Sequence, residues 1–184
     1  GTSAGHPNER HRVYSIVIPA FNQLDYCRQC VQSIQLAAQG PHKLILVDNG
    51  STDGVGDYFD SVPGATVVHT GSNLGFAGGT NAGLAHAEGH VVLLNSDTLV
   101  PTGGLDRLVA ALDRDPQIGL LGPRTNCASG PQQIEGLNFA SLDDINRYAD
   151  TLAEERVGRL RDVARLVGFC MVIRDSVFAA LGPL

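Results

Sequence analysis

The chain has 184 residues, of which 43% are hydrophobic and 17% are charged, a composition typical of one folded domain rather than a disordered segment. Its formal net charge of −6 would repel a nucleic-acid backbone, which argues against DNA and RNA as partners. No apolar run in the sequence approaches the ~20 residues that span a bilayer. Residues 1–12 show no hydrophobic periodicity and predict a flexible leader, and 13–184 are expected to form a single domain.

Short runs of Val, Ile and Leu alternate with segments of helical periodicity along the first two thirds of the chain. Strands are predicted at 14–20, 43–48, 65–70, 90–95 and 118–123. Helices are predicted at 25–39, 52–62, 75–87 and 103–115. Near-continuous apolar strands that alternate with helices indicate a mostly parallel sheet covered on both faces.

The last third of the chain has a different pattern. Residues 124–140 predict a long loop, and long loops in compact domains are often functional. Ser141 is expected to cap a helix over 141–167, whose second half carries Arg156, Arg159, Arg161 and Arg165. A basic amphipathic helix can lie on an anionic membrane, although we favour a solvated face over the core. Residues 167–184 predict a strand and a short helix.

Two of the four cysteines, Cys27 and Cys30, form a C-x-x-C pair. The spacing fits one face of a helix, and no second close pair completes a zinc site. We therefore favour structural thiols over metal or redox chemistry. Free thiols fit a reducing compartment, which predicts a cytoplasmic protein.

Polar segments follow four of the predicted strands, with the sequences PAFN, DNGSTDG, GSNLGFAGG and NSDT. Ligands bind parallel sheets beyond the carboxyl ends of the strands, so we expect these segments to form one constellation. Asp48 could accept hydrogen bonds from a ribose or a base, while Ser51 or Thr52 could cap the next helix. Asp97 offers a carboxylate to Mg²⁺ or Mn²⁺, but its local sequence alone favours a loop cap.

The segment GSNLGFAGGTNAG contains five glycines. Glycines allow a phosphate to approach backbone N–H groups at a helix start, and they also allow a helix to pack closely on a sheet. The segment has no Lys of a Walker A loop, and it follows the third strand rather than the first. Walker A, Rossmann and methyltransferase folds are therefore disfavoured.

Taken together, these motifs resemble the family-2 glycosyltransferases, which have a GT-A type fold. The start SIVIPAFNQLDYCRQCVQSI, the turn LILVDNGSTDG and the stretch NLGFAGGTNAGLAHAEGHVVLLNSDTLV carry the resemblance, and the last is similar to the rhamnosyltransferase-like branch. The resemblance covers about residues 14 to 180. It implies a Rossmann-like three-layer α/β/α fold with a mostly parallel central sheet.

The resemblance also implies an activity. The family members are inverting enzymes that move a sugar from a nucleotide diphosphate donor to an acceptor hydroxyl, in polysaccharide, cell-wall or glycan biosynthesis. Here a UDP- or dTDP-linked donor and a glycan or lipid-linked acceptor are expected, the latter at the inner face of the membrane. Residues 13–123 would form the nucleotide-sugar-binding half, and 124–184 would begin the acceptor-side half.

The residues implied to bind the donor are Pro19, Ala20, Phe21, Asn22, Asp48, Asp53, Asn73, Gly75, Phe76, Asn81, Asn95 and Ser96. The first four would line the nucleoside pocket, the two acids would contact the base and support the same wall, and the next four would lie by the ribose and diphosphate. Asn95 replaces the first acid of the family's Asp-x-Asp motif, and Asp97 would bind Mg²⁺ or Mn²⁺.

The family's catalytic base lies downstream of a segment like GFCMVIRDSVFAALG, so we expect it beyond Leu184 and expect this chain to transfer sugar hardly at all. Two alternatives stay open. One is a nucleotide-sugar-binding domain without catalysis. The other is a nucleotidyltransferase, although such enzymes place a Gly-rich, basic loop after the first strand, and PAFNQ has neither feature.

Overall fold

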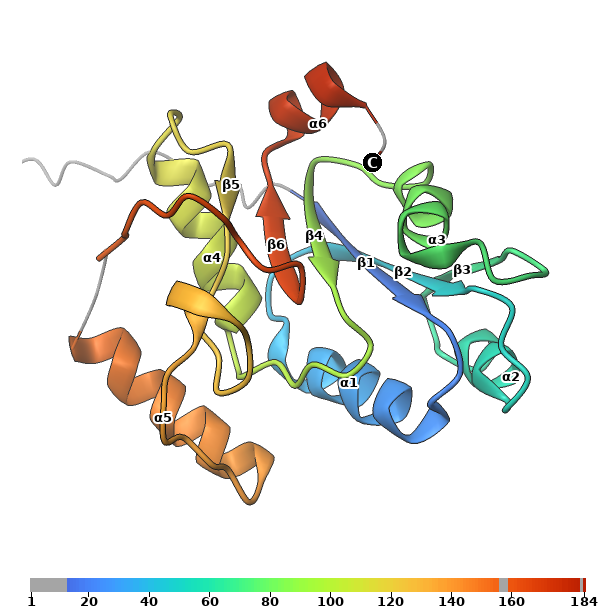
Figure 1. Ribbon diagram of the computed structural model, residues 1–184, viewed down its shortest axis with the longest axis horizontal. Coiled ribbons are helices and arrows are strands. Elements are labelled where there is room, and N and C mark those ends of the chain that lie inside the picture. Colours follow the sequence, from blue (N-terminus) through green and yellow to red (C-terminus); the bar gives the residue numbers. More distant parts are fainter. Residues whose placement is uncertain (1–12, 156–158, 183) are drawn as a thin grey trace, which may run out of the picture.

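A six-stranded mixed sheet, in the order β3-β2-β1-β4-β6-β5, forms the centre of the molecule (Figure 1). The computed structural model describes residues 13–155, 159–182 and 184, so the predicted leader lies outside the described residues. Helices lie on both faces of the sheet (Figure 1). The predicted three-layer α/β/α fold with a mostly parallel sheet is confirmed.

The elements follow one another much as the sequence predicts. The parallel strands are β1 (Tyr14–Ala20), β2 (His42–Asp48), β3 (Thr66–His69) and β4 (His90–Leu94). Strand β6 (Cys170–Ile173) runs antiparallel to both β4 and β5 (Leu120–Leu121). The helices are α1 (Leu24–Ala37), α2 (Val55–Asp60), α3 (Gly75–Leu84), α4 (Gly104–Arg114), α5 (Leu142–Glu155) and α6 (Asp175–Leu181), with a 3₁₀ turn at Gly130–Gln132.

Strand β1 shows why these strands read as continuous apolar runs. Ile16 and Ile18 pack into the core that α1, α2 and α4 share with the sheet, whereas Val17 packs into the core on the α3 side, and all three are fully buried. A strand buried on both faces needs apolar residues at every position. A Cβ atom on Gly83 of α3 would lie 2.5 Å from Val17 Cγ1, so this glycine allows the close helix packing considered above.

The predicted helix over 141–167 is wrong in its second half. Helix α5 ends at Glu155, and 159–169 form neither helix nor strand. This later segment contacts the loop after β5, because the Arg165 side chain donates to Ser129 Oγ and the Val167 N–H donates to the side chain of Gln132. For Val167, a long-range hydrogen bond replaces the helical one that the apolar spacing indicated.

The basic amphipathic helix considered as a membrane contact is therefore also wrong, since Arg159, Arg161 and Arg165 lie outside α5. The fourth arginine of that prediction, Arg156, lies outside the described residues. Within the described ranges, no helix combines the length and the apolar character needed to cross a bilayer.

The predicted cap of α5 is confirmed. Ser141 Oγ accepts a hydrogen bond from the Asp144 N–H at 3.2 Å, and the Asp144 carboxylate accepts from Ser141 Oγ and from the Ala140 N–H. This arrangement satisfies the Asp144 N–H, one of the N–H groups that the first turn of a helix leaves free, and also the Ala140 N–H just before the helix.

Candidate functional site

The polar segments predicted to converge do follow strand ends at one edge of the sheet. Strands β1, β2, β3 and β4 are parallel, so their carboxyl ends share that edge. The last residues of three strands are direct neighbours in register, with Ala20 beside Asp48 and Asp48 beside His69. This is the edge at which parallel α/β sheets bind ligands.

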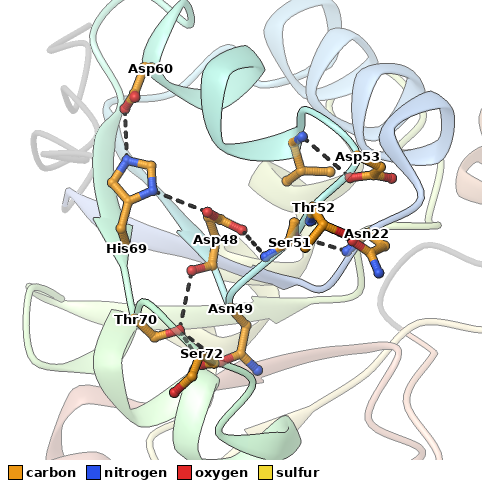
Figure 2. Close-up of polar contacts among 11 residues, drawn as sticks. Asn22, Asp48, Asn49, Ser51, Thr52, Asp53, Asp60, His69, Thr70 and Ser72 are labelled. Atoms are coloured by element: carbon orange, nitrogen blue, oxygen red, sulfur yellow. Dashed lines mark hydrogen bonds and ion pairs between the residues drawn. The ribbon is translucent and has the colours of Figure 1, made fainter.

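The side chain of Asp48, the last residue of β2, is held in place at this edge by hydrogen bonds. Its carboxylate is nearly buried and accepts a hydrogen bond from the Ser51 N–H at 2.8 Å, while its other oxygen lies 3.1 Å from Nδ1 of His69 (Figure 2). Burial by itself would raise the pKa of Asp48, but the hydrogen bonds from Ser51 and His69 outweigh it and hold the pKa below its ordinary value. Asp48 is therefore a fixed, anionic acceptor at neutral pH.

The loops after β1 and β2 are joined by side chains. The Asn22 N–H donates to Ser51 Oγ, and the Thr52 N–H donates to Asn22 Oδ1, both at 2.9 Å (Figure 2). Asn22 has φ of 60°, a left-handed conformation that Asn tolerates better than most residues. The predicted capping role of Ser51 or Thr52 is wrong: α2 begins only at Val55, and these residues serve the contact between loops instead.

Asp53 joins the same loops to two helices. One of its oxygens accepts from the N–H of Leu24, the first residue of α1, at 3.0 Å. The other accepts from the N–H of Val55, the first residue of α2, at 3.4 Å. A carboxylate is stabilised at helix N-termini, so Asp53 joins the loop after β2 to the starts of α1 and α2. Its predicted role beside the bound base stays a prediction.

Asn49 was not singled out from the sequence, although it stands inside the quoted turn. Its buried amide nitrogen donates to Asn73 Oδ1 and to the Gly75 carbonyl, and its oxygen accepts from the Leu74 N–H. These bonds attach the Gly-rich loop to the end of β2. The two loops approach so closely that a Cβ on Gly50, which has φ of +81°, would lie 2.6 Å from the Ser72 backbone, so Gly50 has to be glycine.

The end of β4 carries Asn95, Ser96 and Asp97. The backbone of Asn95 is anchored, because its N–H donates to the Phe169 carbonyl at 2.8 Å and its own carbonyl accepts from the Thr98 N–H. The carboxylate of Asp97 is exposed and accepts no hydrogen bond from the part of the chain that the structure describes.

The oxygen donors at the end of β4 fit a hard divalent cation. Carboxylate, amide and hydroxyl oxygens are the ligands that Mg²⁺ and Mn²⁺ prefer. Over 13–155, 159–182 and 184, no three His, Cys, Asp or Glu side chains gather as a metal cluster. A cation here would thus take one protein carboxylate and depend on phosphate oxygens for further ligands.

The C-x-x-C pair lies on the buried face of α1, as the spacing predicts. Cys27 Sγ donates to the Asn22 carbonyl at 3.6 Å, and Cys30 Sγ donates to the Asn95 carbonyl at 3.5 Å. Burial raises the pKa of Cys27 to about 11 and that of Cys30 to about 12. Both groups are therefore protonated thiols that tie α1 to the loops after β1 and β4.

The other residues assigned from the resemblance have different surroundings. Phe21 and Phe76 expose about half of their surface at this edge, whereas the side chain of Ala20 is buried in the core. The Asn81 amide exchanges two hydrogen bonds of 2.8 Å with the backbone of Leu184.

A pocket of about 280 Å³ opens beside Asp48 and is lined by Asp48, Ser51, Thr52, Gly54, Gly56, Asp57 and His69. His69 was not predicted as a site residue. The available signal was its position, because it is a polar residue at the end of the third predicted strand.

A mostly parallel α/β sheet with a fixed acceptor, Asp48, and an exposed carboxylate, Asp97, at its carboxyl edge belongs to the α/β proteins that bind ligands at this edge. The family model for glycosyl transferase family 2 matches residues 15–182. The chain belongs to this family.

Named relatives agree with this membership. The N-acetylglucosaminyl-diphospho-decaprenol L-rhamnosyltransferase of Mycobacterium tuberculosis (strain ATCC 25618 / H37Rv) is 28% identical over 196 residues, which cover 92% of this chain. The chain spans 64% of the length of that relative. Glycosyltransferase GlyG of Streptococcus pneumoniae serotype 4 is 31% identical over 113 residues, covering 57% of this chain and 38% of GlyG.

Solved structures share the fold. The mannosyltransferase PcManGT from Pyrobaculum calidifontis, in complex with GDP-Man and Mn²⁺, superposes with a TM-score of 0.65 at 23% identity, over 98% of this chain and 49% of PcManGT. S. aureus TarS 1-349 in complex with UDP-GlcNAc gives a TM-score of 0.62 at 17% identity, over 90% of this chain and 46% of TarS.

Proposed function

We propose that this chain forms the donor-binding part of an inverting glycosyltransferase, which transfers a sugar from a nucleoside diphosphate to an acceptor hydroxyl. The observation that carries this proposal is that two carboxylates at one edge of the sheet, those of Asp48 and Asp97, have opposite surroundings. Asp48 is held by hydrogen bonds from the protein, whereas Asp97 is exposed with no such bond from the described residues. The first suits a neutral nucleoside and the second suits a cation with its diphosphate.

The nucleoside would bind against the wall formed by the loops after β1 and β2. An ionised carboxylate accepts hydrogen bonds but donates none, so Asp48 favours a base that presents an N–H group. The imide N–H of uracil or thymine meets this requirement. Guanine and adenine also carry N–H groups, so our proposal of a UDP- or dTDP-linked donor rests on the family resemblance of the sequence. Phe21 and Phe76, both exposed at this edge, are the aromatic surfaces available to the ribose and base.

Asp97 would hold the divalent cation, with Asn95 and Ser96 beside it. When bound, Mg²⁺ or Mn²⁺ would offset the negative charge that develops on the departing nucleoside diphosphate. The residues of this chain supply the orientation: the anchored Asn95 backbone fixes the turn that presents the Asp97 carboxylate.

The acceptor would approach from the side of the sugar opposite the diphosphate, where a general base must remove the proton of its hydroxyl. We assign that base to no described residue. The name of the mycobacterial relative includes N-acetylglucosaminyl-diphospho-decaprenol, which supports a lipid-linked glycan acceptor. The buried free thiols are compatible with a cytoplasmic protein.

Calorimetric titration of the chain with UDP, dTDP, GDP and ADP, each with and without Mn²⁺, tests the proposal. We expect UDP or dTDP to bind more tightly than ADP, and Mn²⁺ to strengthen that binding. Equal binding of all four nucleotides, or binding that Mn²⁺ does not change, would contradict it.

A further inference from the structure

His69 lies between two carboxylates at the end of β3. Its Nδ1 is 3.1 Å from Asp48 Oδ2, and its Nε2 is 3.0 Å from Asp60 Oδ1 (Figure 2). An imidazolium donates from both nitrogens, whereas a neutral imidazole donates from only one. The protonated ring is therefore the form that satisfies both carboxylates at once.

The surrounding elements leave this pair accessible from the pocket beside Asp48. His69 exposes 45% of its side chain, and Asp48 exposes 11%. Gly56 of α2 lies directly against them, because a Cβ there would be 2.8 Å from Asp48 Oδ2 and 3.4 Å from His69 Cε1. His69 thus forms part of the pocket rim, and the Asp48 carboxylate is reached through the pocket.

Both oxygens of Asp48 have a protein partner before any ligand arrives. The Ser51 N–H holds Oδ1 and His69 holds Oδ2. With both oxygens fixed, the carboxylate plane is fixed as well, and its remaining lone pairs have a single orientation toward the pocket. If the His69 bond is lost, only the Ser51 N–H restrains the carboxylate.

We propose that His69 is a positioning residue for Asp48, and that its protonation makes nucleotide binding at this edge dependent on pH. The inference rests on the proposed function, because it assumes that Asp48 contacts the base of a nucleoside diphosphate. Asp60 acts one step further away, by holding the second nitrogen of the ring.

The charges around His69 set the direction of the pH dependence. Asp48 faces the ring from β2, Asp60 faces it from α2, and Asp57 of α2 lines the same pocket. Hydrogen bonds to Asp60 and then to Asp48 raise the pKa of His69 above its ordinary value. The imidazolium is present below that raised pKa and is lost as the pH rises through it. The neutral ring keeps one N–H, which the shorter hydrogen bond to Asp60 holds on Nε2, so Asp48 loses its donor and nucleotide affinity falls with rising pH.

The test measures the dissociation constant of UDP with saturating Mg²⁺ from about pH 5.5 to about pH 8.5, a range that spans histidine titration. The wild-type affinity is expected to fall about fivefold across this range, the value of one ordinary hydrogen bond. The midpoint should match the titration of the His69 ring measured by NMR.

Three variants separate positioning from a merely structural role. His69→Gln retains an N–H donor without titrating, and its affinity should stay near the acidic wild-type value at every pH. His69→Ala should bind about fivefold more weakly throughout the range, with no pH dependence. Asp60→Asn removes a negative charge, so the affinity midpoint and the His69 titration should both shift to lower pH.

Wild-type UDP affinity that does not change with pH, or a His69→Ala variant that binds UDP as the wild type does, would overturn the inference. The Asp60→Asn titration keeps the test decisive if a His69 variant fails to fold, since an unshifted affinity midpoint would also overturn it. Failure of the wild type to bind UDP at every pH would instead contradict the proposed function, and with it the inference.

Discussion

The end of β2 and the end of β4 hold their carboxylates in opposite ways. Asp48 and Asp53 accept hydrogen bonds from three backbone N–H groups, and Asp48 also contacts His69. Asp97 accepts none from the residues described, and it is exposed. Under the proposed function, the end of β2 is preformed before ligand binds, whereas the end of β4 would be completed by the ligand and its cation.

The largest effect on nucleotide binding is expected at the end of β4, where Asp97 is exposed. Asp97→Ala should weaken metal-dependent UDP or dTDP binding roughly 100-fold, because a bridging cation contributes several kcal/mol and each ~1.4 kcal/mol is tenfold. The unfolding midpoint in urea should not change, since Asp97 makes no hydrogen bond within the described chain. Calorimetry with Mn²⁺ measures the first effect and urea titration the second.

Asp143→Ala is the matched control, because it removes an exposed carboxylate from α5, another element of the fold. It should leave binding and its Mn²⁺ dependence unchanged. Equal losses of nucleotide affinity in the two variants would mean that general surface charge, and not cation binding by Asp97, governs binding.

A packing change where α3 meets β1 and β2 should lower the free energy of unfolding. A Cβ on Gly83 would lie 2.5 Å from Val17 Cγ1 and 2.7 Å from Val47 Cγ2, so Gly83→Ala overpacks the contact between α3 and the strands that lead to the wall. We expect a loss of up to about 3 kcal/mol in the free energy of unfolding in urea. Gly168→Ala, which meets no atom within 4 Å, should change it little, and similar losses in both would refute this packing account.

Acid should remove the stability that the ionised Asp48 carboxylate contributes to the fold at the end of β2. Its pKa is held below the ordinary value, so the charged form stabilises the fold above the unfolded pKa of about 3.9 and this contribution is lost as the pH falls through the lowered pKa. Asp48→Asn should cost about 1 kcal/mol at neutral pH. In urea titrations the gap to wild type should shrink toward pH 3, and a constant gap would argue against the lowered pKa.

The two thiols that connect α1 to the loops after β1 and β4 should react slowly with alkylating reagents. Cys27 and Cys30 are fully buried with raised pKa values, whereas Cys127 is exposed. Because the thiolate is the reactive form, iodoacetamide should label Cys127 first in a time course followed by mass spectrometry. Labelling of Cys27 at the rate of Cys127 in the folded protein would favour a reactive C-x-x-C pair instead.

The sequence predicted the sheet well because its signal is local. Strand β1 occupies the predicted 14–20, since a strand buried on both faces must be apolar at every position. The predicted ends of β2 and β4 also indicated that Asp48 and Asp97 lie at one edge of the sheet, because the loops that follow parallel strands lie on the same side.

What the sequence did not predict depends on partners distant in the chain. Ser51 fits a helix cap locally, yet it accepts from Asn22, 29 residues away. His69 shows no periodic signal, and its role appears only when folding brings Asp48 to it from 21 residues away. The absence of helix near Val167 was missed for the same reason, because its N–H donates to Gln132, 35 residues away, and not to a helical carbonyl.

NMR mapping of backbone amides tests the contrast between the two ends most directly. Uridine or thymidine alone should perturb the amides of Asn22, Ser51 and Thr52 and leave 95–98 unchanged. UDP or dTDP with Mg²⁺ should perturb 95–98 as well, and only when both nucleotide diphosphate and cation are present. Perturbation of 95–98 by the nucleoside alone, or no change at the Asp48 wall with any of these ligands, would contradict the account.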